Sequence, residues 1–149
     1  MRNRGPIRSQ GNHESAQEAS IPLSPKNLLE IGMIDILILG GGAIGAGRDL
    51  DNATYKRVEG QVAQEIATLF RQLPSGEPAR CHIPPYGLRF YTEEGLQKQC
   101  SICWMCNNIC GDFQYSFDAN HAVSQSLLAL ISSHVEPHQR YTPSSFERR

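Results

Sequence analysis

Four cysteine residues lie within eleven positions of this chain, close enough to act together as ligands. They are Cys100, Cys103, Cys106 and Cys110, in the spacing C-x2-C-x2-C-x3-C. Thiolates in such groups bind iron–sulfur clusters or zinc, provided that the backbone wraps so that the sulfur atoms converge on one point. The shape of the backbone between residues 100 and 110 therefore decides whether this run has metal chemistry.

The spacing resembles that of bacterial ferredoxins, and the resemblance covers only these eleven residues. It departs from the ferredoxin pattern at Gly111, where a proline should follow the last cysteine. A second cysteine run is also missing, so a single cluster would have to take all four ligands locally or recruit Cys81. Zinc or a 4Fe-4S cluster, bound through C-x2-C-x2-C-x3-C, stays open as the alternative function.

The same residues also fit a buried strand, in which neighbouring sulfur atoms point apart. Residues 100–106 contain no glycine or proline, the residues that a wrapping loop would use. Ile102 and Trp104 favour strands, and cysteine packs as a small hydrophobe. Alternation would divide the run into one face with Cys100, Ile102, Trp104 and Cys106 and another with Ser101, Cys103 and Met105. We favour this interpretation, with inert buried thiols and no cofactor.

Two narrower hypotheses use fewer of these cysteines. Cys103 and Cys106 form a C-x-x-C pair, but redox pairs of this kind are activated at a helix N-terminus, and no helix start is visible here. Cys81 and His82 could join Cys103 and Cys106 as a four-ligand zinc site. The simpler interpretation of His82 is a residue in a proline-rich turn.

A glycine run follows a strand-like segment nearer the N-terminus. Residues 35–50 resemble the opening of FAD-dependent oxidoreductases such as glycerol-phosphate dehydrogenases, which implies pyrophosphate binding at backbone amides. Residues 46–56 have only a weak apolar stripe, and no second strand ends in an acid about 20 residues on. We therefore interpret the run as a glycine-rich connection.

Two amphipathic helices are expected to support these segments. The first spans about 59–73 and stops at Pro74, and the second spans about 119–133, capped by Asp118 or Asn120. Their apolar stripes are Val62, Ile66, Leu69, Phe70 and Leu73 in the first, and Val123, Leu127, Leu130 and Ile131 in the second.

Between the helices, a hairpin is expected at about 87–107, with a first strand at 88–91 and a return strand through 96–107. Residues 114–117 and 34–39 can add two further strands. The predicted fold class is α+β, a small antiparallel sheet packed against the two helices.

Two segments also resemble a family of small uncharacterised bacterial proteins. These are residues 80–90, with a Pro-x-Gly-Leu-Arg-Phe strand start, and residues 101–108, with an Ile-Cys-aromatic-x-Cys strand. The resemblance covers roughly residues 57–132. It implies a compact α+β domain without an established activity, in which the recurrent thiols are Cys81, Cys103 and Cys106.

Composition limits the domain organisation. The 149 residues suffice for one domain, which we place at 29–134, best defined at 57–134. Residues 1–28 and 135–149 are predicted to be disordered tails, because they have few large apolar groups. Translation from Met33 is an alternative to Met1.

Charge and hydropathy exclude several classes of partner. A net charge of −1 argues against nucleic acid, and no apolar run reaches the ~20 residues that cross a bilayer. Residues 31–47 match a signal peptide poorly, and five cysteines, an odd number, fit reduced thiols or metal ligation better than a complete disulfide framework, so we expect a cytoplasmic protein. No catalytic constellation is visible. We expect a small soluble, non-enzymatic protein whose partner is unknown.

Overall fold

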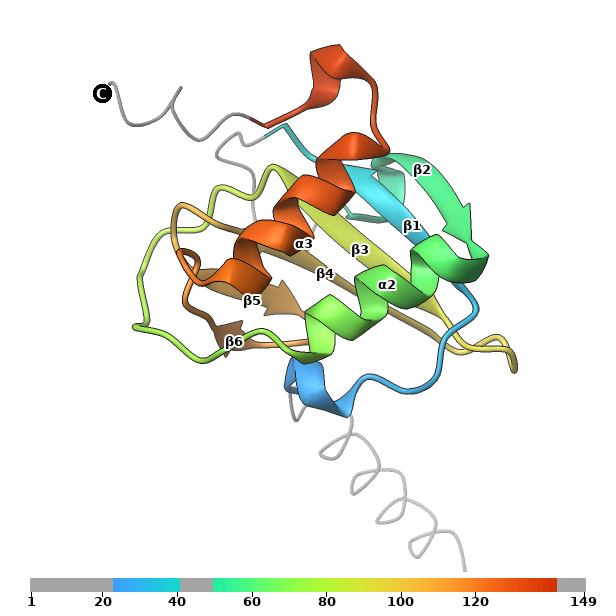
Figure 1. The fold of residues 1–149 in the computed structure, drawn as a ribbon, viewed down its shortest axis with the longest axis horizontal. Coiled ribbons are helices and arrows are strands. Elements are labelled where there is room, and N and C mark those ends of the chain that lie inside the picture. Colours follow the sequence, from blue (N-terminus) through green and yellow to red (C-terminus); the bar gives the residue numbers. More distant parts are fainter. Residues whose placement is uncertain (1–22, 41–49, 142–149) are drawn as a thin grey trace, which may run out of the picture.

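The computed structural model describes residues 23–40 and 50–141. In this part of the chain six strands form one antiparallel sheet in the order β2-β1-β3-β4-β5-β6, and two helices cover one of its faces (Figure 1). The helices are α2 (Gly60–Arg71) and α3 (Ala122–Ser133). The strands are β1 (Met33–Ile38), β2 (Thr54–Glu59), β3 (Tyr86–Tyr91), β4 (Gln97–Cys103), β5 (Asn108–Gly111) and β6 (Tyr115–Ser116). The predicted α+β class is therefore confirmed.

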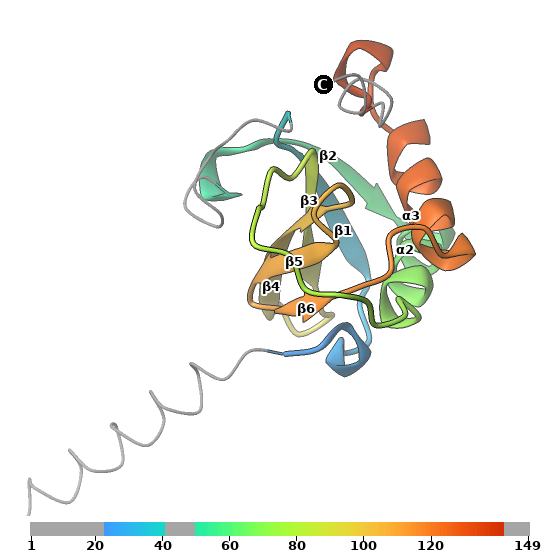
Figure 2. The ribbon, with the colours of Figure 1, turned by 90° about the vertical axis from the view of Figure 1, so that its left-hand side faces the viewer.

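Short 3-10 turns lie at both ends of the described chain and beyond β1. They are η1 (Pro25–Asn27), η2 (Leu50–Asn52) and η3 (Pro137–Gln139). Figure 2 shows α2 and α3 on one side of the sheet and η2 on the other. Within the described residues, no helix has the length and hydropathy of a membrane-spanning segment.

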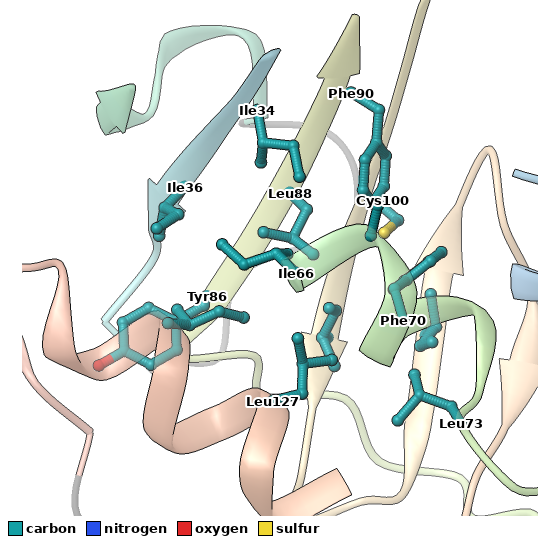
Figure 3. Packing of buried hydrophobic residues seen from close by; sticks show 14 of the residues in the cluster. Ile34, Ile36, Ile66, Phe70, Leu73, Tyr86, Leu88, Phe90, Cys100 and Leu127 are labelled. Atoms are coloured by element: carbon teal, nitrogen blue, oxygen red, sulfur yellow. The ribbon is translucent and has the colours of Figure 1, made fainter. Parts of the chain in front are cut away.

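The core lies between the sheet and the two helices (Figure 3). Ile66, Phe70, Leu127 and Ile131 of the predicted stripes are fully buried, because residues three and four apart share one helix face. The ring of Phe70 packs 4.9 Å from that of Phe90, measured between centroids. The periodicity thus identified the buried helix faces correctly.

The start of the last helix differs from the prediction. Helix α3 begins at Ala122, and His121 caps it by accepting a hydrogen bond from the backbone N–H of Val123 at its Nδ1. Asp118, one of the two predicted caps, instead accepts from the backbone N–H of Asn120, which forms a turn before the helix.

The predicted return strand is too long. Strand β4 ends at Cys103, and the chain then turns through residues 104–107 into β5, a strand that the sequence did not predict. Alternation therefore holds from Cys100 through Trp104, which lies in the helix-side core with Cys100 and Ile102, and it fails at Met105 and Cys106, which lie in the turn. The physical reason is the chain reversal at Asn107, whose left-handed φ of 61° turns the chain back into β5. Trp104 stays on the helix side, where its indole N–H donates to the carbonyl oxygen of Ser124.

Described residues also lie outside the predicted domain of 29–134 at both ends. Residues 23–28, placed in the tail by the sequence, include η1 and the buried Leu28, and Val135 is buried beyond the other boundary. Residues 1–22, 41–49 and 142–149 lie outside the described residues, and with them most of the glycine run. The strand expected at 34–39 is β1, which lies between β2 and β3.

A buried carboxylate organises the sheet face opposite the helices. Asp35 accepts two hydrogen bonds from Arg57, at 2.7 and 3.0 Å, and one from the Tyr91 hydroxyl at 2.8 Å. Arg89 forms a second ion pair with it, at 3.4 Å. Burial alone would raise the pKa of Asp35, but these hydrogen bonds and the two positive charges outweigh burial and hold its pKa below the ordinary value of 3.8.

Replacing Asp35 with Asn will lower the free energy of unfolding by roughly 3 kcal/mol at neutral pH, because Arg57 and Arg89 then lack a charged partner. The lowered pKa stabilises the fold above about pH 4, and this contribution is lost as the pH falls through the folded-state pKa. Urea unfolding followed by circular dichroism should therefore show a shallower acid loss in the variant. In a control, Asp51→Asn at an exposed hydrogen bond to Gln99 should cost about 0.5 kcal/mol or less. Equal effects of the two substitutions would contradict this account.

Candidate functional site

A disulfide bond ties the loop between α2 and β3 to the turn between β4 and β5. Cys81 in the loop and Cys106 in the turn form this bond, with Cα atoms 5.6 Å apart and a sequence separation of 25. Cys81 is exposed to solvent, whereas Cys106 is only 1% exposed. The bond therefore joins one accessible cysteine to one buried cysteine.

A third cysteine lies against the buried half of the bond. The backbone N–H of Cys106 donates a hydrogen bond to Sγ of Cys103, with 3.1 Å between nitrogen and sulfur, and Cys103 is fully buried. Asn107 follows with a left-handed φ of 61°, which turns the chain back into β5 and which asparagine tolerates better than most residues. Cys81, Cys103 and Cys106 thus meet at one end of the β4–β5 hairpin. We call these three residues the cysteine cluster.

His82 holds the same loop against the sheet. Its Nδ1 lies 2.6 Å from Oδ1 of Asn108, and its Nε2 lies 2.6 Å from Oγ of Ser101. The Asn108 amide is oriented by its other end, since Nδ2 donates to the carbonyl oxygens of Ala79 and Cys81. Oδ1 then accepts from Nδ1–H of His82. Nε2 and Oγ of Ser101 share the second hydrogen bond, and Oγ of Ser101 also lies 3.4 Å from the carbonyl oxygen of Cys110, to which it can donate. We call His82, Asn108 and Ser101 the His82 clamp.

An open groove of about 600 Å³ runs beside the clamp. Its walls include Arg80, Cys81 and His82 from the loop and Asn108 and Cys110 from β5. The position of the loop therefore sets the shape of this groove.

The clamp has the connectivity of a nucleophile, a base and an orienting group, as in serine hydrolases. Ser101, in the place of the nucleophile, is however fully buried and does not line the groove. A substrate carbonyl cannot reach a hydroxyl in that position. The clamp is therefore a device that positions the loop.

The four cysteines of the predicted metal site do not come together. Cys100 faces the helices, on the same face as Leu88 opposite it, and burial raises its pKa far above the ordinary thiol value (Figure 3). Cys103 and Cys110 lie on the other face, and Cys106 lies in the turn. In the described residues, no group of three or more His, Cys, Asp or Glu side chains is arranged to hold a metal ion.

The structure instead places near one another the residues of the second, four-ligand zinc hypothesis. These are Cys81 and His82 with Cys103 and Cys106. Two of these thiols are joined to each other, and both ring nitrogens of His82 are occupied by the clamp. The sequence signal was present in Cys81-His82 and in the C-x-x-C pair. The disulfide and the roles of Ser101 and Asn108 were not predicted.

No protein-family model, no curated protein and no solved structure matches this chain. The resemblance to a bacterial family therefore stays a prediction. The function is inferred below from the geometry of the described residues.

The three free cysteines will differ sharply in reactivity. In the native, disulfide-linked protein, iodoacetamide at pH 8 should label Cys110 first, because Cys100 and Cys103 are fully buried. Burial and the nearby Cys103 thiol raise the pKa of Cys110 above 9.0, so its labelling should be slower than that of glutathione and should accelerate with pH. Mass spectrometry of tryptic peptides measures each site. Labelling of Cys100 as fast as that of Cys110 would show that the sheet faces are assigned wrongly.

Proposed function

We propose that this protein is a redox-responsive thiol–disulfide module, non-enzymatic, in which the Cys81–Cys106 bond is the reactive group. The observation that carries the proposal is the pairing of the exposed Cys81 with Cys106, a buried cysteine that has Cys103 against it. Because Cys81 is exposed, a thiol from solution can attack its sulfur atom. The other partner, Cys106, leaves as a thiolate inside the protein, next to the thiol of Cys103.

The reaction is a thiol–disulfide exchange with two external thiols as the reductant. A thiolate attacks Sγ of Cys81, the bond to Cys106 breaks, and Cys106 leaves as a thiolate that takes up a proton. A second external thiol attacks the mixed disulfide, which releases the reductant as its own disulfide and leaves Cys81 as a thiol. Two electrons pass to the protein and no group is left on it.

Breaking the bond changes how the loop is held. A crosslink across a sequence separation of 25 stabilises the fold by about 3.5 kcal/mol in the chain-entropy treatment. After reduction, the His82 clamp still holds the loop, and its hydrogen bonds to neutral groups contribute about 1 kcal/mol each. The groove beside the loop is therefore more rigid in the oxidised protein, and this supports a role in which the redox state controls a binding surface.

The expected compartment supports the same proposal. Disulfides of reducing compartments are mostly transient, catalytic or sensing, whereas structural ones belong to oxidising compartments. The sequence predicts reduced thiols and a cytoplasmic protein, and the first expectation is wrong for Cys81 and Cys106. If the protein is cytoplasmic, this accessible disulfide would exchange with the thiol pool. The remaining cysteine of the sheet interior, Cys100, is structural, because it packs in the core cluster.

The midpoint potential of the Cys81–Cys106 couple tests this proposal. The full chain is equilibrated in glutathione buffers of graded potential, quenched with acid, alkylated and counted by mass spectrometry. We expect a two-electron transition above about −300 mV, the range of exchangeable disulfides, whereas structural disulfides titrate below it.

A matched pair of variants makes the result specific. Cys110→Ser should keep the wild-type midpoint, because Cys110 has no part in the bond, whereas Cys81→Ser should remove the transition. A bond that stays oxidised down to about −300 mV would identify a structural crosslink and would contradict the proposal.

A further inference from the structure

We propose that reduction of the Cys81–Cys106 bond creates a binding site for a thiophilic divalent cation, zinc above all, with Cys81, Cys103 and Cys106 as its ligands. This inference rests on the proposed function, because the bond must open before all three sulfur atoms are free. It moves the metal site away from the C-x2-C-x2-C-x3-C run, two of whose members, Cys100 and Cys110, take no part in it.

The turn between β4 and β5 has the shape that presents two thiolates to one ion. Zinc sites commonly take two ligands from a C-x-x-C turn, in which the chain wraps around the metal. Here the Cys106 N–H points at Sγ of Cys103, at 3.1 Å, and the left-handed Asn107 completes the wrap. A backbone N–H donated to sulfur also complements the negative charge of a thiolate ligand.

The third ligand is already in place. Cys81 and Cys106 have their Cα atoms 5.6 Å apart. After reduction their two sulfur atoms need only move apart to roughly 3.8 Å, the spacing of two tetrahedral ligands with Zn–S bonds of about 2.3 Å. The His82 clamp keeps the loop against β4 and β5 while the bond is open, through contacts that do not involve sulfur. Reduction therefore leaves Cys81 facing the C-x-x-C turn.

The ligand count points to zinc with one open position. Three thiolates and Zn²⁺ release three protons on binding and leave a net charge of −1, with water in the fourth position of the tetrahedron. Both ring nitrogens of His82 are bonded to Asn108 and Ser101, so His82 is not the fourth ligand. Arg80, on the groove wall beside Cys81, is positively charged and complements the anionic site. A 4Fe-4S cluster needs a fourth thiolate, which the cysteine cluster does not supply.

The test measures zinc bound to the full chain in two redox states. Protein reduced anaerobically and freed of reductant should bind about one Zn²⁺ per chain in a competition against a chromophoric chelator, and the disulfide form should bind none. Co²⁺ in place of zinc should give sulfur-to-metal charge-transfer absorption, which reports thiolate ligation directly.

Single variants assign the ligands. Cys81→Ser, Cys103→Ser and Cys106→Ser should each weaken zinc binding by at least roughly tenfold and reduce the charge-transfer intensity. Cys110→Ser is the matched control, because Cys110 is a neighbour of Cys103 on the same sheet face but lies on β5, outside the turn and the loop that supply the three ligands, and it should leave binding unchanged. Loss of binding in Cys110→Ser equal to that in Cys103→Ser would overturn the ligand set.

The two proposals fail separately. Alkylation of the same reduced sample shows whether Cys81 and Cys106 are free thiols. Free thiols without zinc binding would overturn the metal site and leave the redox proposal standing. A Cys81–Cys106 bond that resists the reductant in the folded protein would overturn the redox proposal. Zinc binding at wild-type affinity by Cys81→Ser, Cys103→Ser or Cys106→Ser would overturn the metal site, whatever the state of the bond.

Discussion

The turn at residues 104–107 decides which sulfur atoms of this protein can meet. Pleating places Cys100 and Cys103 on opposite faces of β4, so no straight continuation of the strand could bring the next cysteine back to Cys103. The chain leaves the strand at Trp104, whose indole is anchored on the carbonyl of Ser124 and packs 6.0 Å from the ring of Phe117. Trp104 therefore stays on the helix side, and the turn that follows it, with the left-handed Asn107, brings the backbone N–H of Cys106 to Sγ of Cys103.

The two faces of the sheet consequently carry different chemistry. The helix face is apolar, and its cysteine is held inert by burial. The opposite face carries polar groups that fix two covering segments. Arg89 donates to the carbonyl oxygen of Leu50 at 2.7 Å and holds η2. Ser101 and Asn108 bind the ring of His82 and so hold the loop before β3. Buried polar groups tolerate few alternative partners, because an unmatched group in a low-dielectric interior is costly. These contacts therefore define where the covering segments lie.

The sequence predicted the features that depend on residues close together in the chain, and it missed those that depend on distant contacts or on an unusual turn residue. The helix stripes were found because Ile66, Phe70, Leu127 and Ile131 repeat at helical intervals, and the burial of Cys100 followed from strand alternation. Strand β2 was missed because only Val58 among its residues is buried, which leaves no apolar pattern at this edge. The turn was missed because Asn107, rather than a glycine, takes the left-handed conformation. The bond between Cys81 and Cys106 depends on a contact across 25 positions, which no local pattern contains.

The disulfide and the proposed metal site are alternative uses of the same sulfur atoms, so the loop has three states. In the oxidised protein the disulfide links the loop to the turn. In the reduced, metal-bound protein the shared metal ion links them. In the reduced, metal-free protein neither link is present. The loss of a crosslink worth about 3.5 kcal/mol is small beside the 10–16 kcal/mol that zinc–thiolate sites can supply. The His82 clamp contains no sulfur, so neither opening the disulfide nor binding a metal removes a partner from its hydrogen bonds. The clamp keeps Cys81 close to the turn at residues 104–107. Either the disulfide or the metal–thiolate bonds can then form without a large movement of the loop.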